Sequence, residues 1–359
     1  LLLITFEGAV FQTPTSPLCI TVRQNFPTKM AEEKFWHTVA TTNRLFADGA
    51  AALLSGDGRS GVMRSSLETG NEDVYVVLYI SVWFFIATWI VRKLTIEPLA
   101  RYILPKVTGD AVKLEDRTQK FGQSAIEGLT YGAFSYFGYI IVLSQDWVFP
   151  AHQWVGDLVS KGPGSQHSHY EVDSALSCYV MCYLGRYFSN VVSLFLEARR
   201  KDFWQMLVHH VSTCFLVWTA YFGPWIRIGS VIMVLLDPAD VPLHVAKLLK
   251  YMSATSKGKV VQVRMSNMCD GSFGLFAISF ALMRIVCYPY VVWQATIGWD
   301  WKTLPNEVRI GIGLLYILLG LQAYWFYLIT SMVIKVLRGG QVEDSRSDSD
   351  ECDMHDKTD

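Results

Sequence analysis

Residues 74–91 read VYVVLYISVWFFIATWIV, an apolar stretch of 18 residues without a charged side chain. A helix needs about 20 predominantly apolar residues to cross the hydrocarbon core of a bilayer. Arg92 and Lys93 close the stretch, as basic residues commonly do at the end of a membrane-spanning helix. This segment therefore predicts a transmembrane helix and indicates a membrane protein.

The composition of the whole chain agrees with this prediction. Of the 359 residues, 51% are hydrophobic and 18% are charged, against about 25% charged residues in an ordinary soluble domain. The net charge is −1. These values exclude an intrinsically disordered chain, which would be poor in apolar residues, and a basic nucleic-acid-binding protein.

Six further apolar runs are long enough to be membrane spans. We expect an all-α polytopic membrane protein with about seven transmembrane helices, the last six at residues 128–144, 174–196, 203–222, 228–246, 271–296 and 310–334. Four charged residues lie inside these runs, where each must face protein or water because lipid does not solvate an ion. They are Arg186, Asp237, Asp240 and Arg284.

The distribution of basic residues predicts the orientation of the chain. The first, third, fifth and seventh segments that follow a span contain 17 Lys and Arg residues in total. The segments between them contain four in total. Short cytosolic loops retain the excess of positive charge. We therefore expect an extracytosolic N-terminus and a cytosolic C-terminus.

The two ends of the chain differ from the apolar middle. Residues 1–73 are polar and mixed, which predicts a partly disordered N-terminal region, and no signal peptide is expected there. Met30 is a candidate initiator, so the preceding 29 residues are either an artefact of the gene model or part of the protein. Residues 342–359 contain eight acidic and two basic residues, which predicts a solvated tail. Its serines are either targets of an acidophilic kinase or unmodified: Ser345, Ser347 and Ser349.

The most informative stretch is EARRKDFWQMLVHH at residues 197–210, which ends in two adjacent histidines inside the fourth expected span. Helical spacing places Asp202, Gln205, Met206, His209 and His210 on one face. A single buried histidine is usually a core residue with its hydrogen bonds satisfied, but two adjacent histidines in a membrane helix favour a functional site.

The fifth expected span contains LLDPADVPLH at residues 235–244. Helical spacing places Asp237, Asp240 and His244 on one side, at a depth that matches His209. One hypothesis is that these carboxylates orient an imidazole for general base or nucleophilic catalysis. The alternative is that each aspartate pairs with Arg186 or Arg284 and only holds helices together. Residue types alone leave both open.

These two stretches resemble the Lag motif of the ceramide synthases, which lies within a TLC domain. The motif is carried by RRKDFWQMLVHH and LLDPADVPLHVAKLLKY, and LGRYFSNVVSLFLEARRKDF and CDGSFGLFAISFALMRIVCYP are also similar to that family. The resemblance covers residues 116–338. It implies that six of the transmembrane helices form a bundle around a lipid cavity, with the first helix at residues 74–91 outside the domain.

The resemblance implies an acyltransferase of the endoplasmic reticulum membrane, with a lumenal N-terminus. It would transfer the acyl group of a fatty acyl-CoA to the amine of a sphingoid base and form ceramide or dihydroceramide. Acyl-CoA is then a co-substrate, and no separate cofactor or metal is expected. Dimerisation and a small accessory subunit, both found among relatives, are not decided by the sequence.

The family's paired histidines correspond to His209 and His210, and its paired aspartates to Asp237 and Asp240. His209 is either a nucleophile that forms an acyl-imidazole or a base that deprotonates the amine; the resemblance favours the nucleophile. His210 and Asp237 would orient groups or relay protons, and Asp240 would hold the sphingoid amine or support the cluster. The phosphates of CoA are assigned to three basic residues, which alternatively only set the topology: Arg199, Arg200 and Lys201.

This sequence also departs from the family pattern. Leu236 stands where animal members have a histidine, and Pro238 and Pro242 are additional. We still expect an active enzyme, but one whose choice of substrate is altered by these residues. The acyl-chain length and the particular sphingoid base are not readable from these residues.

The alternative to an enzyme is a non-enzymatic TLC-domain protein that senses lipid or assists membrane insertion. A di-iron desaturase is disfavoured because its HxxHH pattern is missing.

Overall fold

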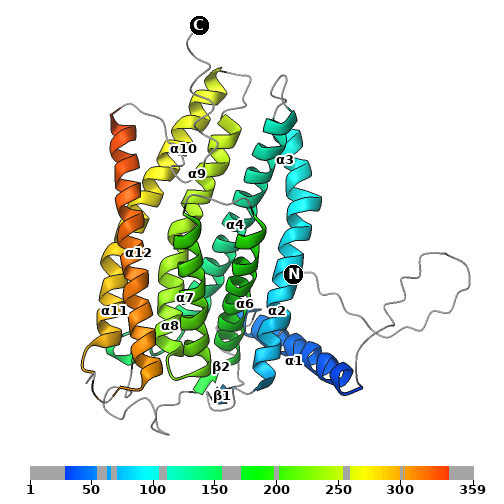
Figure 1. Cartoon of the computed structure of the whole chain (residues 1–359), viewed down its shortest axis with the longest axis vertical. Coiled ribbons are helices and arrows are strands. Elements are labelled where there is room, and N and C mark those ends of the chain that lie inside the picture. Colours follow the sequence, from blue (N-terminus) through cyan, green and yellow to red (C-terminus); the bar gives the residue numbers. More distant parts are fainter. Residues whose placement is uncertain are drawn as a thin grey trace, which may run out of the picture. The chain divides into compact units, whose positions relative to one another are not determined.

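The computed structural model describes residues 29–54, 63–65, 71–104, 111–155, 171–197, 202–253, 259–299, 302 and 304–338 (Figure 1). The described residues from Thr38 onward belong to one compact unit. Its helices, with α1 beginning before this unit, are α1 (Lys29–Leu54), α2 (Asn71–Val91), α3 (Glu97–Ile103), α4 (Ala111–Leu143), α6 (Ser174–Leu196), α7 (Phe203–Phe222), α8 (Ile226–Leu236), α9 (Asp240–Ser253), α10 (Lys259–Phe280), α11 (Tyr288–Thr296) and α12 (Asn306–Leu337). The expected all-α class is confirmed, apart from one antiparallel pair of three-residue strands, β1 (Met63–Ser65) and β2 (Glu171–Asp173).

Five helical segments in the described part of the chain are long and apolar enough to cross a membrane. They are Asp73–Ile103, Leu114–Leu143, Ile226–Ser253, Lys259–Thr296 and Asn306–Leu337. The other two expected spans form α6 and α7, which have 23 and 20 residues. Each contains charged or polar residues, Arg186 in α6 and His209 and His210 in α7. The count of seven spans therefore stays a prediction.

The α6 and α7 helices begin and end at the expected residues. Local chemistry accounts for the start of α6 and the end of α7. The Asp173 side chain caps α6 by accepting a hydrogen bond from the Ala175 N–H at 3.0 Å. Gly223 follows α7 in an extended conformation, and Pro224 has no backbone N–H with which to continue the helix.

Three long helices contain a turn of different pitch. The π-helical turns η2 (Arg92–Ile96) and η6 (Ala281–Cys287) lie between α2 and α3 and between α10 and α11. The 3-10 turn η5 (Asp237–Ala239) separates α8 from α9 and contains Pro238. Such irregular turns in long helices frequently occur at functional sites. Two of the three carry charged residues that were singled out from the sequence, Asp237 in η5 and Arg284 in η6.

The helix bundle is held by close packing rather than by the exclusion of water, which does not act between helices in lipid. The α2 and α6 helices approach most closely at Gly185, where an added Cβ atom would lie 2.6 Å from Cγ2 of Ile80. Val180 and Leu184 of the same helix are completely buried. The opposite face of α2 exposes apolar side chains such as Val82, Trp83 and Trp89, as expected for contact with lipid.

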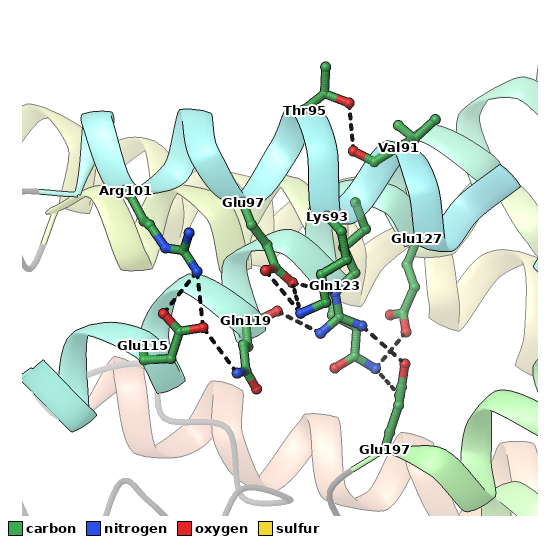
Figure 2. Close-up of polar contacts among 11 residues, drawn as sticks. Val91, Lys93, Thr95, Glu97, Arg101, Glu115, Gln119, Gln123, Glu127 and Glu197 are labelled. Carbon is green, nitrogen blue, oxygen red and sulfur yellow. Dashed lines mark hydrogen bonds and ion pairs between the residues drawn. The ribbon is translucent and has the colours of Figure 1, made fainter. Parts of the chain in front are cut away.

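Polar contacts tie the segment after the first span to α4 and α6 (Figure 2). The carboxylate of Glu97, 1% exposed, binds both Arg92 and Lys93. Gln123 of α4 donates hydrogen bonds to Glu127 and to Glu197 at the end of α6. The first helix was expected to end at Val91, but helical structure continues to Ile103. The continuation contains four charged residues, and the buried one, Glu97, is paired within the protein.

Candidate active site

A cavity of about 60 Å³ lies among α6, α7, α8, η5, η6 and α12. This volume holds a few water molecules and is well below the roughly 300–1,000 Å³ of sites for drug-sized ligands. His209, Asp237, Asp240 and Arg284 line it. His209 and both aspartates therefore line one cavity.

The two histidines of α7 have different environments. His209 is partly buried and lines the cavity, with its ring 5.3 Å from that of Trp325 on α12. His210 is 7% exposed and packs against Tyr187, at a ring distance of 5.6 Å, without lining the cavity. Among the described residues, neither Nδ1 atom has a hydrogen-bond partner. His209 is therefore the histidine placed to contact a bound ligand.

Both aspartates bind arginines. Asp237, 2% exposed, accepts hydrogen bonds from Arg186 Nη1 and from the Tyr183 hydroxyl, each at 2.9 Å. Asp240 lies 2.5 Å from Arg284 Nη2. The aspartates therefore contact arginines, as the second of the two alternatives from the sequence expected. The positive charge of each arginine compensates the negative charge of its aspartate.

Aromatic rings surround the Arg186 guanidinium, which is 4% exposed. Its Cζ atom lies 4.2 Å from the ring centre of Tyr131 and 4.9 Å from that of Phe134. Cation–π contacts of this kind stabilise a desolvated guanidinium. Arg186, which these rings immobilise, therefore holds Asp237 on one wall of the cavity.

His244, which was expected to share a side with the two aspartates, does not line the cavity. His244 is buried on α9, stacks on Tyr131 of α4 at 5.5 Å, and places Nε2 3.5 Å from Glu127. His210 likewise does not share the cavity with His209.

Sequence reasoning missed several residues of this site, including Tyr183, Tyr187 and Gln322. Gln322 was identifiable, because an amide side chain in the apolar run at residues 310–334 needs an explanation at membrane depth. The tyrosines were not identifiable, since tyrosine is common in apolar helices. The three residues assigned to CoA phosphates, Arg199, Arg200 and Lys201, lie outside the described residues, as does the acidic tail at residues 342–359.

Within the described ranges, no group of three or more His, Cys, Asp and Glu residues has the arrangement of a metal site. The groups that the cavity presents are an imidazole, two arginine-bound carboxylates and an amide. These groups suit hydrogen bonding and proton transfer to a polar ligand head, while the apolar residues of α8 and α12, such as Met233 and Leu318, suit an acyl chain.

This chain is similar to known proteins over most of its length. A family model described as the TLC domain matches residues 120–331. ASC1-like protein 3 of Oryza sativa subsp. japonica is 31% identical over 290 residues, covering 77% of this chain and 95% of that protein. Ceramide synthase LOH2 of Arabidopsis thaliana is 28% identical over 320 residues, covering 84% and 99%. Ceramide synthase hyl-1 of Caenorhabditis elegans is 28% identical over 235 residues, covering 61% and 58%.

Proposed function

This chain belongs to the TLC-domain family, and on that premise we propose that it is a ceramide synthase, an acyl-CoA-dependent N-acyltransferase of sphingoid bases. The reaction joins the acyl group of a fatty acyl-CoA to the amine of sphinganine, sphingosine or phytosphingosine and releases CoA. The observation that carries the proposal is the position of His209, whose side chain shares an enclosed cavity with Asp237 and Asp240.

The neutral imidazole of His209 performs one of two steps. As a nucleophile it attacks the thioester carbon, forms an acyl-imidazole and releases the CoA thiolate; the amine then attacks the acyl-imidazole. As a general base it takes the proton from the amine while the amine attacks the thioester directly. We favour the nucleophile. Intact-mass analysis after mixing the protein with acyl-CoA alone separates the routes, because only the nucleophilic one leaves an acyl adduct on the protein.

The aspartates position the amine substrate and the helices around it. A carboxylate has about four lone-pair positions, and Arg284 occupies only part of those on Asp240. The remaining positions accept N–H groups of the sphingoid amine. Asp237 is more completely engaged, by Tyr183 and Arg186, so its role is to fix η5 and Asp240 beside His209. His210 supports the His209 face of α7 from within the bundle.

The substrates enter from the membrane and the cytosol. The enclosed volume is too small for two lipid chains, so the chains extend from it between the helices, and the thioester and the amine meet in the cavity. Arg199, Arg200 and Lys201 follow α6 directly and receive the CoA phosphates. We place the protein in the endoplasmic reticulum membrane with its C-terminus in the cytosol. Glycosylation-site tags at each terminus test this orientation.

Product analysis tests the function. The purified protein in proteoliposomes, given a fatty acyl-CoA and sphinganine, should form dihydroceramide and one equivalent of CoA. A folded protein that binds either substrate but forms no amide would contradict the proposal and would support the non-enzymatic lipid-binding alternative.

A further inference from the structure

Gln322 of α12 has the least expected environment among the cavity residues. Its side chain is completely buried at 0% exposure, although an amide carries two donors and one acceptor. It lines the same cavity as His209. A polar side chain buried at membrane depth costs free energy unless its groups are bonded, so its retention there needs a reason.

The contact with Arg284 fixes which way the amide faces. Arg284 Nη1 donates to Gln322 Oε1 at 3.3 Å. A guanidinium has only donors, so the oxygen of the amide must face Arg284 and its nitrogen must face away. Nε2 of Gln322 has no hydrogen-bond partner in the described part of the chain. The site therefore contains an oriented N–H donor that the protein itself does not use.

Several neighbouring donors on the cavity wall are already engaged, although Nε of Arg284 has no partner among the described residues. The Tyr183 hydroxyl donates to Asp237 at 2.9 Å, and the Thr213 hydroxyl donates to the backbone oxygen of His209 at 2.8 Å. Arg284 Nη2 serves Asp240 and the Leu236 carbonyl oxygen. An acyl-transfer reaction needs a donor for the negative charge that develops on the carbonyl oxygen.

We propose that the Nε2 amide group of Gln322 is the oxyanion donor of this site, a catalytic residue that contacts the carbonyl oxygen of the acyl group. The inference rests on the acyltransferase function proposed above. Attack on the thioester carbon forms the new bond and moves the C=O π electrons onto oxygen, where Gln322 donates its hydrogen bond. Collapse re-forms the C=O bond and breaks the C–S bond. The thiolate of CoA leaves, and the proton that the amine loses on forming the amide balances the charge of this thiolate in either route.

A purely structural role makes a different prediction. If Gln322 only supplied an acceptor for Arg284, any residue that accepts from Arg284 would suffice. Gln322→Glu has the same size and still accepts from Arg284. Because a carboxylate beside a guanidinium is ionised, this variant has no donor toward the substrate. Gln322→Met removes both the acceptor and the donor.

The test compares kcat and KM of wild type, Gln322→Glu and Gln322→Met in proteoliposomes with an acyl-CoA and sphinganine at pH 8. The donor role predicts that both variants lose about 100-fold or more in kcat, as removal of one oxyanion donor does, while KM for each substrate changes little. Gln294→Glu is the matched control and should keep wild-type turnover, because Gln294 lies on α11 and donates to the Tyr290 hydroxyl at an exposed position.

Each outcome decides the matter. Full activity in Gln322→Glu with loss only in Gln322→Met would reduce Gln322 to a residue that positions Arg284, and activity within threefold of wild type in both would remove it from the reaction. If Gln322→Glu shows no melting transition, the kinetic constants of Gln322→Met decide: a loss of about 100-fold in kcat with an unchanged KM for sphinganine supports the donor role, whereas a raised KM for sphinganine shows that Gln322 only positions Arg284 and, through it, Asp240. A wild-type protein that forms no amide refutes the proposed function itself, which distinguishes that failure from failure of the Gln322 role.

Discussion

The carboxylate of Asp240 lies 2.5 Å from Nη2 of Arg284, although 44 residues separate them in the chain. The same Nη2 donates to the Leu236 carbonyl oxygen at 2.8 Å. Arg284 therefore connects the π-helical turn η6 to both sides of the 3-10 turn η5. The Arg284 guanidinium therefore holds together η5 and η6, the two irregular turns that contribute charged residues to the site.

Arg284→Met should destabilise the protein and inactivate it. The variant leaves the Asp240 charge without its arginine and removes the donors to Leu236 and Gln322. Removal of one partner of a buried ion pair costs about 3–5 kcal/mol. Thermal melting should show a lowered Tm, and the double variant Asp240→Asn/Arg284→Met should recover part of it. A double variant less stable than Arg284→Met would contradict the pairing.

Asp237 should matter far more for stability than an exposed acidic residue in a similar contact. Asp237→Ala leaves the buried Arg186 uncompensated, so we expect a loss of about 3–5 kcal/mol. Glu115→Ala is the matched control, because its pair with Arg101 is about half exposed and contributes about 0–1 kcal/mol. Equal changes in Tm for the two variants would show that the Arg186 contact does not carry the stability assigned to it.

His209→Ala and His210→Ala should each abolish turnover without unfolding the bundle. The His209→Ala variant lacks the reacting imidazole, which accelerates such a reaction about 100-fold or more. His210 loses the packing against Tyr187 that supports the same face of α7. Rates of amide formation, with melting curves as the measure of folding, check both. His152→Ala is the control, since that side chain is exposed in a connecting segment. Near-normal rates in both variants would return the pair to core packing.

Gly185→Val should separate α2 from α6. The added Cβ atom would lie 2.6 Å from Ile80, and overpacking of this kind costs about 1–3 kcal/mol. Gly132→Val on α4 provides a control with the same change in helix propensity, because a Cβ atom there meets nothing within 4 Å. The Tm of Gly185→Val should be clearly lower than that of the control; a lower Tm in the control would overturn the packing argument.

The sequence predicted the limits of a helix well where local signals bound the apolar run. The α6 and α7 helices begin and end at the expected residues because Asp173, Gly223 and Pro224 act locally. The extension of helical structure from Val91 to Ile103 was not predictable from hydropathy. Its polar residues look like a solvated loop until Glu97 is seen to bind Arg92 and Lys93.

The candidate site was predictable as a set of residues, but its contacts were not. Adjacent histidines and intramembrane aspartates identify the relevant helices, because such groups are costly in lipid. Residue types do not decide whether an aspartate binds a histidine or an arginine. They also do not show that His244 stacks on Tyr131 of α4 instead of lining the cavity.

The central claim is that His209 and the arginine-bound aspartates form the site of amide synthesis. The most direct measurement incubates wild type and His209→Ala, in matched proteoliposomes, with isotope-labelled palmitoyl-CoA and sphinganine and detects labelled dihydroceramide by mass spectrometry. The account predicts labelled product from wild type and none above background from the variant. Labelled product at equal rates from both proteins, or none from a folded wild type that binds acyl-CoA, would contradict it.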